Sequence, residues 1–409
     1  MSKYIYIMAI TLMVLTAACS LVSAPQPSQV TPPAPPPSVA IPGQTAAPYL
    51  TEGGLPQPLV TVNSVEICLN SRYSQHSLSG TATNQQISNI LWAAGKAPLT
   101  GGHRDILVNT ATGRYLYKPG THALSAQPGQ AVSGGALMLS CDSDLAFDTG
   151  LAYMLAILGS VSLGKSSEQP VASCPKGADL FFGVQEGRGL TSEPVAHCSL
   201  PKSDPGWLPD PSTDGQNKLE DVLANLNYVN QFSPANLSLQ QISQLLWAGY
   251  GCTPHEVAGG KKGLTVPSAM AAYYLTNTIY LANEKGMYRY HDRKPDADLT
   301  TRDHRLEPLM SVDVRNKLAA AVIGLPSAPC YVIICLGQNA SSARGGNWAL
   351  EEAGFVGANM LVQASAIGLG CNFKADLAAD QQTAIREATS IPSTETPQVI
   401  ISTGIPAVR

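Results

Sequence analysis

The 409-residue chain has few charged residues, few aromatic residues and no excess of positive charge. Asp, Glu, Lys and Arg make up 13% of it and the formal net charge is −4, so it lacks the basic surface expected for nucleic-acid binding. It also lacks a second long apolar run after its N-terminus, which excludes a protein with several membrane spans. A hydrophobic fraction of 44% supports folded cores, and the length predicts two or three domains.

Signatures of metal binding are also lacking in the sequence. No His-Glu-x-x-His motif is present, and the pairs Cys252-x-x-His255 and His197-Cys198 are too isolated to specify zinc. We therefore expect no metal site.

The first 58 residues predict an export signal followed by a tether. Lys3 precedes the apolar run 4–18, which is too short to span a bilayer and ends in small residues, as signal peptides do. The sequence Leu15-Thr16-Ala17-Ala18-Cys19 resembles a bacterial lipobox, so residues 1–19 form a lipoprotein signal peptide with lipidation at Cys19. An ordinary signal peptide is the alternative. Residues 20–58 are rich in proline and are expected to form an extended, disordered tether.

The remaining chain carries the same segments twice, in the same order. Residues 85–93 match 240–248, and residues 113–117 match 286–290. An apolar strand ending at Cys141 matches one ending at Cys335. The growing spacing indicates that the first copy has lost segments, mainly between the first two matches. Three matches in one order predict an internal duplication.

The duplication divides the folded part into two halves that mix helices and strands. The first half covers residues 59–190, a connector rich in Pro, Ser and Asp covers 191–216, and the second half covers 217–409. Periodicity predicts helices at 84–94, 149–162, 239–249, 268–284, 313–322 and 347–367. It predicts strands at 114–118, 135–141, 178–184, 287–290, 329–335 and 397–403. The last strand of each half is a continuous apolar run, as in a sheet covered on both faces, so we expect a layered α/β fold.

Four segments of the second copy resemble the nitroreductase superfamily. Within that superfamily they resemble the branch of SagB-type FMN-dependent dehydrogenases. They are Leu245-Leu246-Trp247-Ala248, Thr265-Val266-Pro267-Ser268-Ala269, Gly286-Met287-Tyr288-Arg289-Tyr290 and Ala366-Ile367-Gly368-Leu369-Gly370-Cys371. The resemblance covers most of residues 60–190 and 217–406. It implies an α/β (α+β) fold of two nitroreductase-like three-layer units with mixed sheets. It also implies FMN at the interface between units, so a tandem repeat forms an intramolecular pseudo-dimer and a monomer suffices.

In this family a basic-basic-Ser-x-basic stretch holds the FMN phosphate. The first copy has Arg72-Tyr73-Ser74-Gln75-His76, in which Arg72 can bind a phosphate bidentately, Ser74 can donate a hydroxyl bond and His76 stands at the second basic position. Tyr73 departs from the pattern, and a polar surface helix end is the alternative. The second copy has Leu226-Asn227-Tyr228-Val229-Asn230, without positive charge, so a phosphate there would be uncompensated.

The segment Pro267-Ser268-Ala269 shows the reverse asymmetry, because only the second copy has it. Proline and serine suit the first turn of a helix, where backbone N–H groups can face an anionic or polar ligand. The resemblance implies that this segment reaches the FMN of the opposite unit, and an ordinary helix start is the alternative. We therefore expect at most one composite FMN site, made by Arg72, Ser74, His76, Pro267, Ser268 and Ala269. The rival expectation is that both sites have decayed.

Two further cations are candidates for this site. Lys165 follows a helix end and can balance charge on reduced flavin, although a lysine there also suits the helix dipole. Arg188 follows the last strand of the first copy, where the resemblance implies a basic residue. No nucleophile–His–acid set is apparent, and the catalytic residues stay unknown, because in a flavoenzyme the cofactor carries the redox chemistry.

Without Cys19, eight cysteines remain, an even number that permits disulfides in an exported chain. Cys174 and Cys198 frame the end of the first half and are the first candidate pair. Cys141 and Cys335 are expected to be buried thiols at equivalent positions of the repeat.

These patterns predict an exported oxidoreductase of the cell envelope, anchored by lipid on the periplasmic or cell-surface side. Its reaction would be two-electron transfer between FMN and an unknown organic substrate. The alternative is a non-catalytic binding or scaffold lipoprotein built from decayed domains.

Overall fold

The structure, a computed structural model, describes residues 52–129, 137–164, 169–175, 179–195, 200–293, 299–338, 340 and 346–407. All of them belong to one compact unit, Ala46–Arg409. The predicted signal peptide with Cys19, most of the tether, Lys165 and the Cys198 partner of Cys174 lie outside the described residues. In the described part, none of the helices is both long enough and apolar enough to span a membrane.

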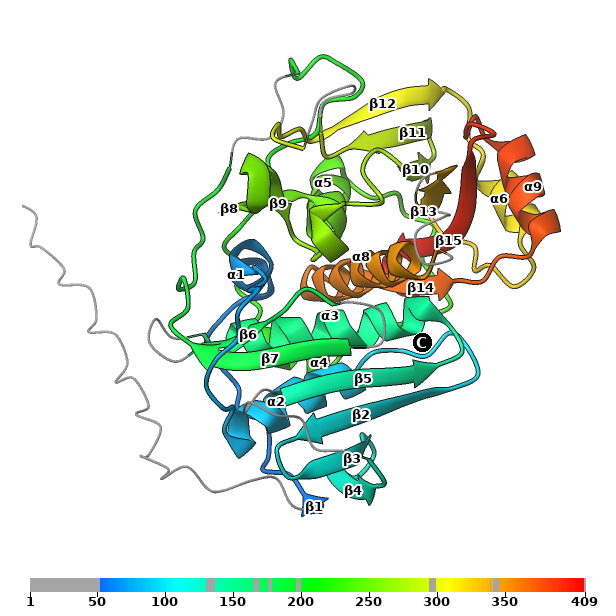
Figure 1. The fold of residues 1–409 in the computed structure, drawn as a ribbon. Helices are drawn as coiled ribbons and strands as arrows, with labels where there is room; N and C mark the ends of the chain where they lie inside the picture. Colours follow the sequence, from blue (N-terminus) through cyan, green and yellow to red (C-terminus); the bar gives the residue numbers. More distant parts are fainter. Residues whose placement is uncertain are drawn as a thin grey trace, which may run out of the picture. The chain divides into compact units, whose positions relative to one another are not determined.

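The first half forms a seven-stranded sheet in the order β1-β4-β3-β2-β5-β7-β6 (Figure 1). Its strands are β1 Gly53–Gly54, β2 Arg104–Thr110, β3 Gly113–Lys118, β4 Ala123–Gln127, β5 Leu137–Ser143, β6 Gln169–Ala172 and β7 Asp179–Gln185. Its helices are α1 Val65–Ser71, α2 Asn84–Gly95 and α3 Ala146–Ser162.

The second half forms a six-stranded sheet in the order β12-β11-β10-β13-β15-β14 and a separate hairpin, β8-β9. Its strands are β8 Cys252–Glu256, β9 Lys262–Leu264, β10 Ile279–Asn283, β11 Gly286–His291, β12 Arg305–Met310, β13 Cys330–Gly337, β14 Gly370–Lys374 and β15 Glu395–Gly404. Its helices are α4 Leu219–Ala224, α5 Leu239–Tyr250, α6 Arg315–Ala321, α8 Asn347–Ala366 and α9 Ala379–Ala388, with short 3₁₀ turns at Ala258–Gly260 and Ala269–Ala271.

The predicted α/β class with two units is confirmed, but the expected mixed sheets are not seen. Every strand pair of the two large sheets is antiparallel in the described residues. The parallel pairing that is present is an isolated bridge between Tyr228 and Cys371. Helices α6 and α9 cover the outer face of the second sheet with their own apolar cluster, which includes Leu318 and Ile385 (Figure 1).

Helices α3 and α8 cross at the centre of the molecule and join the two halves (Figure 1). Their backbones meet at two glycines: a Cβ on Gly354 would lie 2.2 Å from the carbonyl oxygen of Phe147 and 2.8 Å from Cα of Gly150. A side chain at either glycine would therefore push the helices apart. This contact fixes how the two halves face each other.

Replacing Gly354 with valine is expected to lower the free energy of unfolding by roughly 1–3 kcal/mol, because the added atoms overpack the crossing. Urea denaturation followed by circular dichroism measures this loss. Gly120→Ala is the control, since no heavy atom lies within 4 Å of a Cβ built there. Equal stability of Gly354→Val and the parent chain would show that the crossing is loosely packed.

Both halves repeat a buried polar arrangement between their strands and helices. Ser88 on α2 lies 2.8 Å from Nε2 of His122 and donates to the carbonyl oxygen of Pro56, while the Tyr117 hydroxyl lies 2.8 Å from Nδ1 of the same ring. The second half makes the same contacts with Ser243, His304, Pro209 and Tyr290. Thus Pro56, assigned to the tether, accepts a hydrogen bond from α2 of the first half. Pro209, assigned to the connector, accepts one from α5 of the second half.

A second symmetric contact lies at the start of α1 and α4. The Val65 N–H donates to the Asn217 carbonyl oxygen at 3.1 Å, and the Leu219 N–H donates to the Asn63 carbonyl oxygen at 3.0 Å. These reciprocal bonds relate the two halves by an approximate two-fold axis. They also give a residue-by-residue correspondence between α1 and α4.

Two of the predicted features are wrong. The helix expected at 268–284 is instead one 3₁₀ turn, a loop and β10, because Met270, Ala271, Tyr273 and Asn277 have positive φ and Ile279–Asn283 pairs with two strands. The equivalence of Cys141 and Cys335 is off by one residue.

Strand pairing shows the shift between the two cysteines. Cys141 pairs with Ile106, whereas the matching Ile279 pairs with Ile334. Cys335 is fully buried as a free thiol, but Cys141 is only partly buried.

Candidate functional site

Arg72 lies at the end of α1 and reaches into the other half. Helix α1 begins at Ser64, whose side chain accepts the Ile67 N–H at 3.2 Å, and Arg72 follows with extended backbone. Its guanidinium donates to the Leu264 carbonyl oxygen at 2.7 Å and faces Nε2 of His255 at 3.3 Å. Both partners belong to the hairpin β8-β9, which lies against α1 (Figure 1). The guanidinium also donates to the Ser74 hydroxyl at 3.2 Å, so Arg72 and Ser74 are brought together as predicted.

The positive charge of Arg72 is buried without an acidic partner. The residue is 1% exposed and takes part in none of the ion pairs of the described residues. Its Nε atom is buried and has no hydrogen-bond partner. Burial lowers the pKa of Arg72 to about 10. A buried cation without a counter-charge is costly, so this environment fits an anionic ligand that would pair with it.

His255 lies among the charges of Arg72, Arg188 and Arg302, and of these residues sequence reasoning did not assign His255 and Arg302 to the site. Burial, and then Arg72, Arg188 and Arg302, lower the pKa of His255 well below its ordinary value, so the ring is neutral at neutral pH. Arg302 donates to the Thr253 carbonyl oxygen at 3.4 Å. No local motif marks His255 or Arg302, because only the tertiary fold brings the second-half hairpin to α1.

Arg188 lies beside the same region, as the sequence predicted. It is exposed, and its guanidinium stacks on the Tyr73 ring at 4.7 Å. Tyr73, which departs from the family pattern, therefore holds Arg188, whose charge acts on His255 together with that of Arg72. The predicted His76 is exposed and forms no ion pair in the described part of the chain.

Ser268 is buried, but it does not begin a helix. Its Oγ accepts the Tyr273 N–H at 2.7 Å, and its hydroxyl acts against the burial that raises the pKa of Glu352. Pro267 and Ala269 flank it, and Ala269–Ala271 forms one 3₁₀ turn, so the expected helix N-terminus facing a ligand is absent here. Burial raises the pKa of Tyr273 to about 12, and the nearby charge of Arg72 acts in the opposite direction. Arg72 and the segment that Ser268 begins therefore share one region between the halves.

Two buried carboxyl groups lie behind this segment. Glu352 on α8 accepts the Tyr250 hydroxyl and the Leu275 N–H, the latter at 3.3 Å, and burial raises its pKa to about 7. Asp292 pairs with Arg293 at 3.3 Å, and burial raises its pKa to about 6. The signal for Glu352 in the sequence is the pair Glu351-Glu352 near the start of a largely apolar helix.

The region of the second half that corresponds by the approximate two-fold axis to the surroundings of Arg72 can be identified from matching hydrogen bonds. The Gln75 N–H donates to the Ala172 carbonyl oxygen at 3.0 Å, and the Val229 N–H donates to the Cys371 carbonyl oxygen at 3.0 Å. Counting from these bonds, Ser74 corresponds to Tyr228, Cys174 to Phe373 and Arg72 to Leu226.

A third correspondence comes from the central helices. Asp148 on α3 accepts the Thr100 and Gly101 N–H groups at 3.0 and 2.7 Å, just as Glu352 accepts the Leu275 N–H on α8. The residues before them, Phe147 and Glu351, are therefore equivalent.

The two regions related by the approximate two-fold axis differ in the side chains that fill them. In the second, the Phe147 and Phe373 rings are 5.5 Å apart, and the Tyr228 and Phe373 rings are 5.4 Å apart. In the first, the equivalent side chains are Glu351, Cys174 and Ser74, and Ser74 bonds Arg72. One region is thus packed with aromatic rings and lacks a cation at its Leu226 position, while the other is polar and positively charged.

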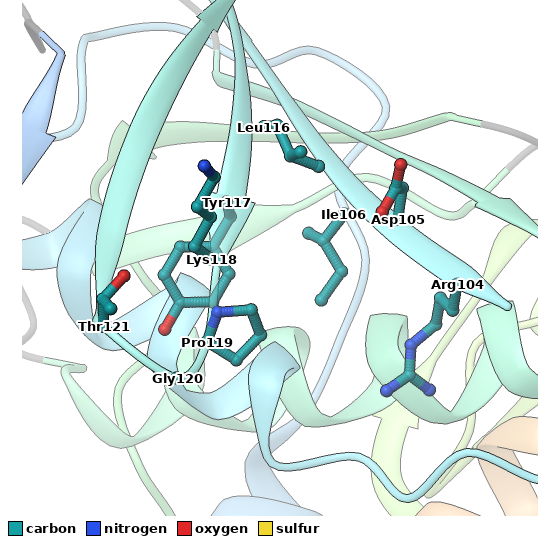
Figure 2. Close-up of a pocket in the computed structure, with 9 residues that line it drawn as sticks. All are labelled: Arg104, Asp105, Ile106, Leu116, Tyr117, Lys118, Pro119, Gly120 and Thr121. Atoms are coloured by element: carbon teal, nitrogen blue, oxygen red, sulfur yellow. The ribbon is translucent and has the colours of Figure 1, made fainter.

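A separate cavity of about 350 Å³ lies beside β2 and β3. Figure 2 shows its lining residues, which are Arg104, Asp105, Ile106, Leu116, Tyr117, Lys118, Pro119, Gly120 and Thr121. Arg104 there donates to the carbonyl oxygens of Ala97, Pro98 and Asp148, so its charge already holds the adjacent loop. None of the predicted site residues lines this cavity.

Comparison with known proteins identifies the fold. The Nitroreductase family model matches residues 229–405. A candidate nitroreductase of Methanocaldococcus jannaschii is 29% identical over 164 residues, 37% of this chain and 76% of that protein. The crystal structure of a candidate nitroreductase from Anabaena variabilis, at 12% identity and a TM-score of 0.54, covers 84% of this chain and 100% of that chain. An FMN-dependent nitroreductase from Clostridium difficile, at 15% identity and a TM-score of 0.30, covers 46% and 87%. The Anabaena structure therefore shares the fold across both halves.

Proposed function

We propose that this chain, in which residues 229–405 form a nitroreductase-family domain, is an exported FMN-binding oxidoreductase with one composite site between its two halves. Its reaction is two-electron transfer between FMN and an organic substrate. The buried guanidinium of Arg72, which has no acidic partner among the described residues, is the observation that carries this proposal.

The residues around Arg72 fit a phosphate monoester. Arg72 and Ser74 supply donors from the first half, and Arg188 and Arg302 add positive charge. His255, neutral and facing Nη2 of Arg72, orients the guanidinium without competing for the anion. FMN supplies the hydride chemistry when it is bound. The protein's part is to fix its phosphate, to orient its ring near the Ser268–Tyr273 segment and to exclude water.

One site per chain follows from the asymmetry of the halves. The corresponding region of the second half has Leu226 in place of Arg72 and three packed aromatic rings. It therefore has neither the charge nor the space for a phosphate. The repeated Ser–His–Tyr arrangement and the reciprocal bonds of α1 and α4 support a tandem duplication within one chain. We place the duplicated ancestor in the SagB-type branch on the sequence motifs, and we infer that the chain works as a monomeric pseudo-dimer.

The N-terminal sequence supports a location outside the cytoplasm for this chain. Its lipobox-like end supports lipidation at Cys19 and attachment to a membrane of the cell envelope, with the proline-rich segment as a spacer. Reduced nicotinamides are cytoplasmic, so the electron donor belongs to the envelope.

The aromatic packing of Phe147, Tyr228 and Phe373 also favours a second candidate function, a non-catalytic scaffold that has lost flavin altogether. Flavin retention separates the two. We expect the purified chain, incubated with FMN and passed through gel filtration, to keep close to one flavin per chain in its visible absorption spectrum. A colourless protein would support the scaffold, and two flavins per chain would contradict the composite site.

A further inference from the structure

The segment from Ser268 to Asn277 is a strained loop held by buried acids. Four of its non-glycine residues have positive φ: Met270 at 55°, Ala271 at 51°, Tyr273 at 52° and Asn277 at 59°. Backbone of this kind persists only where the surroundings impose it, and it clusters at functional sites. Most of the loop is shielded, but the Met270 side chain is 72% exposed.

Glu352 on α8 is one of the buried groups that bond this loop. Its carboxyl group accepts the Leu275 N–H at 3.3 Å and the Tyr250 hydroxyl from α5, and the Tyr250 oxygen also accepts the Leu275 N–H at 3.2 Å. Ser268 accepts the Tyr273 N–H, and Asp292 accepts the Asn277 N–H at 3.3 Å. The second carboxyl oxygen of Glu352 is buried without a partner.

We propose that Glu352 is a positioning residue that holds the Ser268–Asn277 loop closed beside Arg72, and that closing the loop takes up a proton at its carboxyl group. This inference rests on the proposed flavin function for its ligand. Glu352 acts through the loop, so it orders the wall of the composite site without belonging to the reacting groups.

The sign of the proton effect follows from burial. Burial in the closed loop raises the pKa of Glu352 from an ordinary 4.5 to about 7, so the closed state binds the proton more tightly than an open, hydrated state. Closure is therefore most favourable below about pH 4.5 and weakens as the pH rises to about 7. Facing groups are Tyr250, Tyr273, Tyr274 and Asp292. Asp292 titrates in the same range, so each variant is compared with the parent chain, which shares it.

Two readouts on Glu352→Ala and Glu352→Gln test this role: amide hydrogen exchange of Leu275 and Asn277 without ligand, and FMN affinity from flavin fluorescence quenching. Glu352→Ala is expected to speed exchange at both amides and to weaken FMN binding about tenfold, the usual effect of removing a supporting partner. Glu352→Gln keeps an acceptor for Leu275 and Tyr250, so it should bind FMN near neutral pH like the parent. Its exchange and affinity should lose part of their dependence on pH between about 4.5 and about 7.

Asp148→Asn is the matched control, because Asp148 holds the equivalent loop of the first half in the same way. It should leave both the exchange at Leu275 and the FMN affinity unchanged. Parent-like exchange at Leu275 and Asn277 in Glu352→Ala, or an equal effect of Asp148→Asn, would overturn the role of Glu352. If the parent chain binds no FMN, the proposed function fails, and the exchange measurement still decides whether Glu352 holds the loop.

Discussion

Replacing Arg72 with methionine is expected to abolish FMN retention, with a loss of affinity of about a hundredfold or more, because the phosphate would lose its buried partner. The same change should leave the ligand-free protein about as stable as the parent, since an uncompensated buried cation costs roughly as much as its bonds contribute. Flavin titration and thermal unfolding without ligand measure the two effects. This combination separates a ligand-binding residue from a structural one.

Arg104→Met is the control for Arg72, because Arg104 is another largely buried arginine of the first half. It donates to the carbonyl oxygens of Ala97 and Pro98 in the adjacent loop and of Asp148 on α3, so its loss should lower the unfolding temperature but keep one flavin per chain. If Arg72→Met were destabilised like Arg104→Met and still bound FMN, Arg72 would be a structural residue.

Replacing Cys174 with phenylalanine is expected to close the composite site. Phenylalanine is the residue at the equivalent position of the second half, where the Phe373 ring packs against Phe147 and Tyr228. The larger side chain would occupy the space beside Arg72 and lower FMN affinity by about a hundredfold, equivalent to about 2.8 kcal/mol. Flavin titration by fluorescence quenching measures the change.

Cys174→Ala controls for the loss of the thiol and should bind FMN as the parent does. In the opposite half, Phe373→Ala should lower the free energy of unfolding by about 3–5 kcal/mol without changing the number of flavins bound. A Cys174→Phe protein that binds FMN normally would show that the flavin lies elsewhere.

The sequence predicts most of the architecture because the matching segments of the two halves carry clear local signals. The matching Leu-Trp-Ala helices and the matching Tyr-containing strands lie in equivalent places, and α3 and α8 were expected as long helices. Arg72 and Ser74 also lie together, as their spacing suggested. Each of these features depends on a short stretch of chain.

What the sequence does not predict depends on contacts between distant segments. His255 and Arg302 reach Arg72 only through the tertiary fold. Helix α9 was missed because its pattern is polar and only Ile385 is buried. The register of Cys335 was misjudged beside an irregularity in β13, between Ile334 and Cys335.

The helix expected at 268–284 failed for a different reason. Its alanines and apolar spacing suit a helix, but strand pairing of Ile279–Asn283 and the bonds of Glu352 favour a strained loop. Tertiary bonds outweighed local propensity at a segment beside the candidate site, where such conflicts are expected.

A crystal structure of the chain grown with FMN tests the central claim most directly. The composite site predicts one flavin per chain, with its phosphate on Arg72 and Ser74, its ring toward the Ser268–Tyr273 segment, and no flavin among Phe147, Tyr228 and Phe373. A flavin bound in that aromatic region, or a phosphate away from Arg72, would contradict the account.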